Sequence, residues 1–260
     1  MPQSIVIYLI LERSSEIMGG QKFAVLLCAD DWDYVKNNYG GYLGVYKRLL
    51  KEEGDEWDAF RVSRDEFPAD DVIGDYSGFV ITGSSSCADG NDLWIGKLLE
   101  LLKRLDFRKK KVLGICFGHQ ILGRALGGKI GRSSAGWDIG ITKVHLFPSQ
   151  IVSSMTMPES LSVIECHRDE VYELPPEVEL LAWSEKTGVE MFKYGDHMMG
   201  IQGHPEYTKD ILLHLIDRIV DNGIIGESIA EVAKMKLEEA SEADEEAWKK
   251  LCIGFLKGRM

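Results

Sequence analysis

Cysteine and proline are scarce in this chain, and no run of apolar residues approaches the length of a membrane span. Five cysteines and seven prolines occur among 260 residues, and no Cys-x-x-C pair is present. An odd number of dispersed cysteines predicts neither a disulfide framework nor a structural zinc site. Free thiols suit a reducing compartment, which we expect to be the cytosol. The apolar run at residues 5–11 is short, whereas a membrane-spanning helix needs about 20 residues.

Positive charge is also in deficit. The chain has 30 Lys and Arg against 42 Asp and Glu, which gives a formal net charge of −12 and a pI near 5.0. Nucleic acids and anionic membrane surfaces bind basic faces, because cationic side chains release their counterions. We therefore expect neither as a partner, and we interpret the acidity as a contribution to solubility. No metal ion and no other cofactor is predicted.

The length and composition suit one large domain with small appendages. Hydrophobic residues make up 45% and charged residues 28% of the chain, which is ordinary for a protein with a full core. Met18 stands just before the first strand-like run, so we expect residues 1–20 to be an N-terminal extension of uncertain order. We predict a main domain over residues 21–220 and a C-terminal helical extension, residues 221–260, packed on the same domain.

Strand-like and helix-like segments alternate through the first half of the chain. Short apolar or alternating runs bounded by loops predict strands, and the longer segments between them have helical spacing. The strands are expected at residues 22–28, 56–62, 79–81 and 111–115, and the helices at 34–53, 92–105 and 117–126. This alternation predicts an α/β fold, a three-layer sandwich with a mostly parallel central sheet covered on both faces.

The pattern changes near Gly140, after which short strands follow one another without long helices. We expect several of them to be antiparallel additions to the sheet, at residues 140–145, 161–166, 178–184, 189–194 and 198–202. The end of the chain is helical again. Residues 209–220 have apolar side chains at helical spacing, which we assign to core packing. Residues 241–244, Ser-Glu-Ala-Asp, have the form of a capping box and predict the start of a final helix.

The segment 114–120, Gly-Ile-Cys-Phe-Gly-His-Gln, follows a predicted strand directly and opens a predicted helix. A strand that ends in Gly-x-Cys-x-Gly and turns into a helix has the form of a nucleophile elbow, with sulfur in place of the serine oxygen. The helix N-terminus directs free N–H groups at the thiol of Cys116, which favours the thiolate. The N–H of Phe117 is then the first donor to an oxyanion. A buried structural cysteine at a strand end is the alternative.

A cysteine nucleophile needs a base within hydrogen-bond reach and a group that orients this base. His204 follows the apolar run 198–202, and Glu206 stands two residues further on. The base and its orienting carboxylate would therefore come from one short segment. His167 lies in a polar segment after a predicted strand and is a candidate for substrate contact. We predict the catalytic triad Cys116, His204 and Glu206.

These motifs resemble those of the class I glutamine amidotransferase family. Residues 114–120 are similar to the cysteine elbow of the family, and residues 202–206 are similar to its His-x-Glu signature. Within the family, the similarity is greatest to the plant γ-glutamyl peptidases of glutathione-conjugate processing. The segments that show it are 39–42, 110–120, 127–132, 166–171, 202–207 and 255–259. Residues 85–90 depart from the family's pattern.

The resemblance implies a flavodoxin-like fold and makes residues 21–220 a class I glutamine amidotransferase-like catalytic domain. It implies an oxyanion hole formed by two backbone N–H groups, those of Gly83 and Phe117. It also implies a substrate site that includes Gln120, His167, Arg168 and Asp169.

The implied enzyme is a thiol-dependent hydrolase, a γ-glutamyl (omega) peptidase. Its nucleophile Cys116 would attack the γ-carbonyl of glutathione or its S-conjugates, and a γ-glutamyl thioester would then release glutamate. This small-molecule substrate implies a place in glutathione metabolism, glucosinolate biosynthesis included. The alternative is a glutaminase subunit that delivers ammonia to a separate synthetase, because glutamine presents the same γ-carbonyl and amino-acid head. A binding protein without activity is a third hypothesis, against which the intact triad argues.

Overall fold

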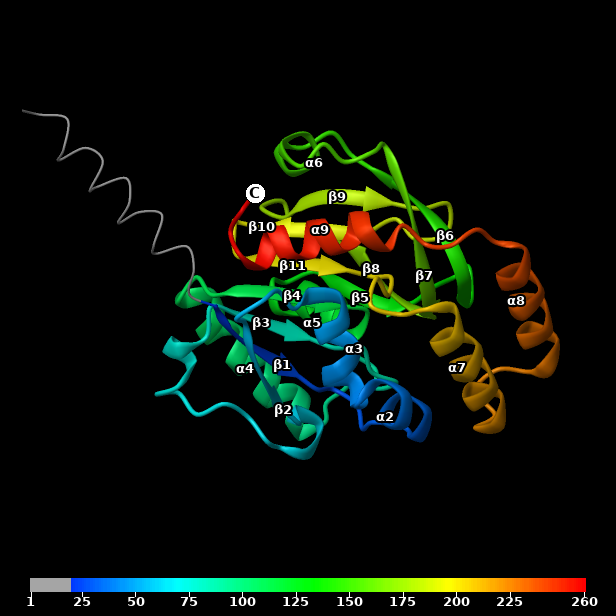
Figure 1. Cartoon of the computed structure of the whole chain (residues 1–260), viewed down its shortest axis with the longest axis horizontal. Helices are drawn as coiled ribbons and strands as arrows, with labels where there is room; N and C mark the ends of the chain where they lie inside the picture. Colours follow the sequence, from blue (N-terminus) through cyan, green and yellow to red (C-terminus); the bar gives the residue numbers. More distant parts are fainter. Residues whose placement is uncertain (1–19) are drawn as a thin grey trace, which may run out of the picture.

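Nine strands form one central sheet in the computed structural model, which describes residues 20–260 (Figure 1). The strand order is β2-β1-β3-β4-β11-β10-β9-β6-β7. The first five strands in this order are parallel: β2 (Glu56–Phe60), β1 (Lys22–Leu26), β3 (Gly78–Ile81), β4 (Lys111–Ile115) and β11 (Met198–Ile201). The predicted extension at residues 1–20 lies, except for Gly20, outside the described residues.

The other half of the sheet is antiparallel, as expected from the change of pattern near Gly140. It consists of β10 (Met191–Tyr194), β9 (Glu179–Trp183), β6 (Asp138–Leu146) and β7 (Ser160–His167). A separate two-stranded sheet pairs β5 (Lys129–Arg132) with β8 (Asp169–Glu173). The polar segment that contains His167 is therefore not a loop. His167 ends β7, and Asp169 begins β8, because a single residue suffices to turn the chain between the two sheets.

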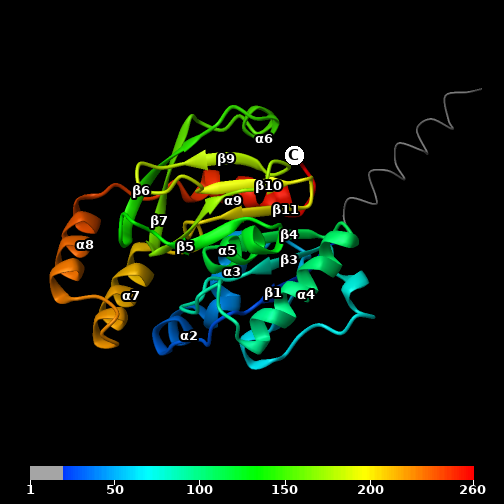
Figure 2. The same cartoon turned by 180° about the vertical axis from the view of Figure 1, so that it is seen from behind.

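Helices cover both faces of the sheet, which confirms the predicted three-layer α/β fold (Figures 1 and 2). One layer contains α4 (Leu93–Phe107) and α5 (Phe117–Ala125), and the opposite layer contains α3 (Gly41–Leu50) and α9 (Glu245–Leu256). The side chains of β1 alternate between these layers. Phe23 and Val25 join the hydrophobic cluster of α3 and α9, whereas the neighbours Ala24 and Leu26 join that of α4 and α5. Such a strand is apolar throughout because both of its faces are buried.

The helix expected over residues 34–53 is two helices. The first is α2 (Asp33–Tyr39), and the second is α3. Gly40 between them has φ 75° and ψ 32°, the left-handed conformation that ends a helix. Short helices occur elsewhere as η1 (Val62–Arg64), η2 (Ile73–Asp75) and α6 (Gln150–Ser154).

The C-terminal part contains α7 (Lys209–Asp221), α8 (Glu227–Glu239) and α9. The predicted capping box at residues 241–244 does not form, although Asp244 is the N-cap of α9. Its carboxylate instead accepts a hydrogen bond from the backbone N–H of Ser162 at 2.6 Å, and its own N–H donates to Ser162 O at 3.0 Å. Ser162 belongs to β7, the last strand of the sheet, so Asp244 satisfies backbone groups that an edge strand leaves unpaired.

Buried side chains of α9, among them Trp248 and Phe255, belong to the same hydrophobic cluster as β1. The C-terminal helix thus packs on the main sheet, while the boundary at residue 220 stays a prediction. Among residues 20–260, no helix has the length and apolar character that crossing a membrane would require.

Candidate active site

Cys116 stands between β4 and α5 in a strained backbone conformation. Its φ is 52° and its ψ is −104°, although it is not a glycine. Non-glycine residues seldom adopt positive φ, and those that do concentrate at functional sites. The side chain is buried, and the residue is the N-cap of α5. The structure therefore has the backbone geometry of the elbow that the sequence predicts.

The glycines on both sides of Cys116 allow the strand and the helix to approach each other. A Cβ on Gly114 would lie 2.3 Å from the carbonyl oxygen of Gly118, and a Cβ on Gly118 would lie 2.4 Å from the carbonyl oxygen of Ile81. Both distances are far shorter than real contacts of a Cβ. Because the obstacles are backbone atoms, no side-chain rotation relieves them.

His204 lies beside the elbow, although it is far from Cys116 in sequence. A Cβ on Gly83 would be 2.9 Å from His204 Cε1 and 3.8 Å from Cys116 Cβ, so the three residues meet at one place. The segment after β11 is held in position by its backbone. Gln202 N donates to Glu190 O at 2.8 Å, and His204 N donates to Ile164 O at 2.7 Å.

Glu206 lies against the imidazole of His204, where the prediction requires the orienting carboxylate to be. Nδ1 of His204 and Oε1 of Glu206 are 2.8 Å apart, and both side chains are buried. The ring of Tyr207 stacks on the imidazole at a centroid distance of 4.1 Å and an interplanar angle of 5°. Burial by itself lowers the pKa of His204. The charges of Glu206 and Cys116, and the hydrogen bonds of the ring to both, outweigh burial and raise that pKa to about 10.

The two predicted oxyanion donors both lie close to Cys116. Gly83 follows β3, and Phe117 is the first residue of α5. Among the described residues, neither amide N–H donates a backbone–backbone hydrogen bond outside regular helix and strand pairing. Backbone N–H groups of this kind, at the end of a strand and the start of a helix, can stabilise a developing oxyanion. Their roles stay predictions.

Three of the four residues predicted to bind substrate come together around one backbone carbonyl. Asp169 O accepts from Nε2 of Gln120 at 2.7 Å and lies 3.1 Å from Nδ1 of His167. The side chain of Asp169 pairs with Arg132 Nε at 2.8 Å, a partner that was not predicted. Arg168 is exposed and does not join this group. The geometry therefore separates Arg168 from Gln120 and His167.

Two buried glutamates next to this group escaped prediction. One carboxylate oxygen of Glu165 lies 3.3 Å from Nε2 of His167. Burial raises the pKa of Glu165 and of Glu190 well above its usual value of 4.5, and the negative charge of a neighbouring carboxylate raises it further. Because Nδ1 of His167 faces a carbonyl oxygen, that nitrogen has the proton. Nε2 of His167 and both carboxylate oxygens of Glu165 have no hydrogen-bond partner among the described residues.

A family model described as Glutamine amidotransferase class-I matches residues 34–212. The chain belongs to the class I glutamine amidotransferase family. Two relatives from Arabidopsis thaliana are named gamma-glutamyl peptidase 5 and gamma-glutamyl peptidase 3. The first is 48% identical over 92% of this chain and 96% of the relative, and the second is 45% identical over 92% and 97%. The predicted resemblance to plant γ-glutamyl peptidases is thereby confirmed.

A solved glutamine amidotransferase structure from Thermotoga maritima is similar to the chain, with a TM-score of 0.69. The aligned region covers 92% of this chain and 98% of the Thermotoga maritima chain, at 20% sequence identity. At this identity the similarity concerns the fold alone, and it agrees with the fold class predicted for the chain.

In this member of the glutamine amidotransferase family, a further unpredicted residue contacts Glu206 of the proposed triad. Tyr46, on α3, is buried, and its hydroxyl donates to Glu206 Oε1 at 3.1 Å. Residues 42–50 have apolar and aromatic side chains at helical spacing, so the sequence indicates only that this face of α3 belongs to the core. The partner Glu206 is 160 residues away in the chain.

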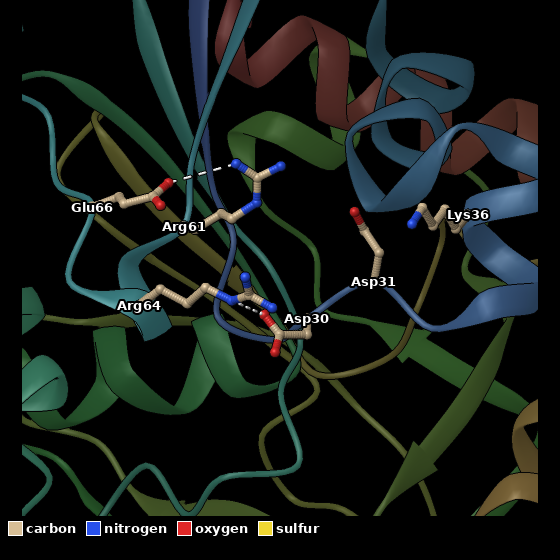
Figure 3. A pocket seen from close by; sticks show the side chains of 6 residues that line it. All are labelled: Asp30, Asp31, Lys36, Arg61, Arg64 and Glu66. Atoms are coloured by element: carbon tan, nitrogen blue, oxygen red, sulfur yellow. Dashed lines mark hydrogen bonds and ion pairs between the residues drawn. The ribbon is translucent and has the colours of Figure 1, made fainter.

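A charged pocket opens after the carboxyl ends of β1 and β2 (Figure 3). It is lined by Asp30, Asp31, Lys36, Arg61, Arg64 and Glu66. Arg64 Nε lies 2.6 Å from Asp30 Oδ1, and Arg61 Nη1 lies 3.5 Å from Glu66 Oε2. The three cations are thus matched by three carboxylates, and the lining does not favour a ligand of either charge. Among the described residues, no cluster of His, Cys, Asp and Glu has an arrangement suited to a metal ion.

Proposed function

We propose that this protein is a cysteine-dependent γ-glutamyl peptidase. The observation that carries the proposal is the position of His204, which is hydrogen-bonded to the Glu206 carboxylate and meets Cys116 and Gly83 at the elbow. The similarity over nearly the full chain to proteins named gamma-glutamyl peptidases supports the choice of a γ-glutamyl substrate.

In the proposed reaction, the thiolate of Cys116 attacks the γ-carbonyl carbon of the substrate. The N–H groups of Gly83 and Phe117 hold the resulting oxyanion. The imidazolium of His204 gives its proton to the leaving amine as the C–N bond breaks, which leaves a γ-glutamyl thioester. His204 then takes a proton from water, the hydroxide oxygen bonds to the carbonyl carbon, and glutamate leaves as the thiolate forms again.

We further propose that glutathione and its S-conjugates are the substrates, in the cytosol, with a function in glutathione metabolism. This follows from the resemblance to the plant peptidases, glucosinolate biosynthesis being one setting for it. The leaving group would be the amino nitrogen of the cysteine residue. The five free cysteines, four of them buried or half-buried, agree with a reducing compartment.

The test is product analysis by mass spectrometry without ATP. Purified protein is incubated separately with glutathione, with a glutathione S-conjugate and with glutamine, and Cys116→Ala is the control. We expect glutamate and the corresponding cysteinylglycine product in equal amounts, and neither from the variant. Fast hydrolysis of glutamine with intact conjugates would favour the glutaminase alternative. No product from any of the three substrates would refute a hydrolase of this class.

A further inference from the structure

The hydroxyl of Tyr46 shares one carboxylate oxygen with the catalytic histidine. Oε1 of Glu206 lies 3.1 Å from the Tyr46 hydroxyl and 2.8 Å from Nδ1 of His204. The other oxygen, Oε2, is buried and has no hydrogen-bond partner among the described residues. The orientation of this carboxylate therefore depends on two donors, one of which is the base that it has to orient.

Helix α3 also holds the backbone of Glu206. Nη2 of Arg48 donates to Glu206 O at 3.1 Å, and Nη1 of Arg48 pairs with Glu245 at 2.7 Å at the start of α9. Tyr46 and Arg48, two residues apart on α3, thus contact the side chain and the main chain of the same residue. The helix is a rigid support for Glu206 because its own side chains are packed in the core.

Burial also keeps the phenol protonated. It raises the pKa of Tyr46 well above 10, and the charge of Glu206 raises that pKa further. The hydroxyl therefore remains a hydrogen-bond donor to Glu206 Oε1.

We propose that Tyr46 is a positioning residue, which fixes the carboxylate of Glu206 so that His204 faces Cys116. The inference rests on the proposed function, since it concerns the same triad. Without the phenol, the carboxylate has one donor fewer and is free to rotate toward its unpartnered oxygen. The carboxylate then stabilises the imidazolium of His204 less, and the Cys116 thiolate that pairs with this imidazolium forms less readily.

Charged and titratable groups face the phenol from several elements. Glu206 and His204 come from the segment after β11, Cys116 comes from the elbow, and Tyr207 lies beside them. On α3 itself, Arg48 is engaged by Glu245. Of these groups, only Glu206 accepts a hydrogen bond from the Tyr46 hydroxyl, so removal of the hydroxyl acts first on that carboxylate.

The experiment compares Tyr46→Phe with Tyr76→Phe in the full chain. Tyr76 is a matched control because it is also buried and its hydroxyl donates to a carboxylate oxygen, Asp58 Oδ2, at 2.7 Å. Tyr76 lies just before the amino end of β3, away from the elbow. A hydrogen bond to a charged group corresponds to about tenfold or more in rate. We expect kcat of Tyr46→Phe on a γ-glutamyl substrate to fall by about this factor with KM within about twofold, and Tyr76→Phe to retain wild-type kcat.

The second readout is the pH dependence of Cys116 alkylation by iodoacetamide, followed by peptide mass spectrometry. We expect Cys116 to become reactive at higher pH in Tyr46→Phe than in the wild type and in Tyr76→Phe. An unchanged alkylation profile, a profile shifted to lower pH, or equal kcat losses in both variants would refute the positioning role. If Cys116→Ala retained activity, the proposed function itself would fail, which is a separate result.

Replacement of Tyr46 by 3-fluorotyrosine through site-specific incorporation keeps the hydroxyl and tests the case in which Tyr46→Phe does not fold. Fluorine makes the phenol a stronger donor and leaves its shape almost unchanged. We expect Cys116 alkylation to keep its pH profile or to move to lower pH, and the fluorine resonance to shift when Cys116 is alkylated. A resonance that does not respond to alkylation would contradict the connection to the triad.

Discussion

Glu165 and His167 lie on the same face of β7, and a carboxylate oxygen of Glu165 is 3.3 Å from Nε2 of the imidazole, with both side chains buried. His167 in turn contacts Asp169 O, which accepts from Gln120 on the elbow helix α5. A buried carboxyl is thus connected to Gln120 on the helix that follows Cys116 through two intermediate groups, His167 and Asp169 O. The protonation state of Glu165 therefore affects the free energy of unfolding.

Glu165→Gln should stabilise the protein more at alkaline than at acidic pH. The pKa of Glu165 is raised by burial above 4.5, so the folded protein retains a proton that the unfolded chain releases. The stability from this proton is fully present below about pH 4.5 and is lost as pH rises through the raised pKa. Glutamine has a similar shape and no such proton. We expect the variant's advantage in free energy of unfolding to grow from about pH 5 to about pH 8 in denaturant titrations.

The exposed Glu177 provides the control for this experiment. Glu177→Gln should leave the pH dependence of unfolding as it is in the wild type, since its carboxyl is hydrated in both states. A difference between Glu165→Gln and the wild type that is constant over this pH range would show that the buried carboxyl is ionised.

Glu206→Gln should lower activity and move its alkaline limit to lower pH. The Glu206 charge is the largest of the effects that raise the pKa of His204 to about 10 against burial. An amide removes this charge, so the imidazolium loses its proton at lower pH, and a wrong tautomer is favoured. We expect kcat to fall by about 10²–10⁴. The measurement is kcat against pH for the variant, for Glu177→Gln and for the wild type. An alkaline limit that does not move would contradict the role of the carboxylate.

Gly118→Ala should abolish activity and destabilise the fold, whereas Gly96→Ala should not. A Cβ at Gly118 would be 2.4 Å from Ile81 O, so α5 would have to move away from the end of β3. Gly96, in α4, has nothing within 4 Å of the corresponding position. There the alanine should stabilise the helix by about 1 kcal/mol. Thermal melts and activity assays of the two variants check this, and a fully active Gly118→Ala would show that the elbow tolerates displacement.

Lys257→Met should destabilise the protein far more than Lys129→Met. Lys257 Nζ lies 2.7 Å from carboxylate oxygens of both Asp55 and Glu52, and the side chain of Asp55 is fully buried. Removal of the cation leaves an uncompensated buried charge, which costs about 3–5 kcal/mol. The pair of Lys129 with Glu173 is exposed on both sides, so its loss should cost about 0–1 kcal/mol. Equal losses in chemical denaturation would contradict the difference in burial.

The three residues of the proposed triad could be selected from the sequence because they lie in short motifs, and the structure brings them together. The Gly-x-Cys-x-Gly turn shows its glycines at fixed spacing around Cys116, and His204 and Glu206 are two residues apart after an apolar strand. The parallel half of the sheet was predictable for a related reason, since strands that are buried on both faces are apolar throughout.

Residues whose function depends on distant partners could not be found in this way. Tyr46 has the helical spacing of a core residue, and its partner Glu206 is 160 residues away. Glu165 occupies an inward position of a strand, where a charged residue contradicts the expected pattern and indicates an unusual environment. The predicted capping box before α9 was wrong because the Asp244 carboxylate binds the edge strand β7, which is distant in sequence and therefore invisible in the local motif.

Local spacing along the chain was therefore sufficient to propose Cys116 and His204 as nucleophile and base and to predict the order of the central elements, since neighbouring residues and backbone conformation produce these motifs. Long-range packing was required to bring α3 to Glu206, Glu165 to His167 and Asp169 to Gln120. These contacts join segments from separate strands and helices, and their geometry depends on how the two halves of the sheet meet beside Cys116. The physical reason is that hydrophobic spacing specifies which face of an element is buried, and not which polar group it will meet there.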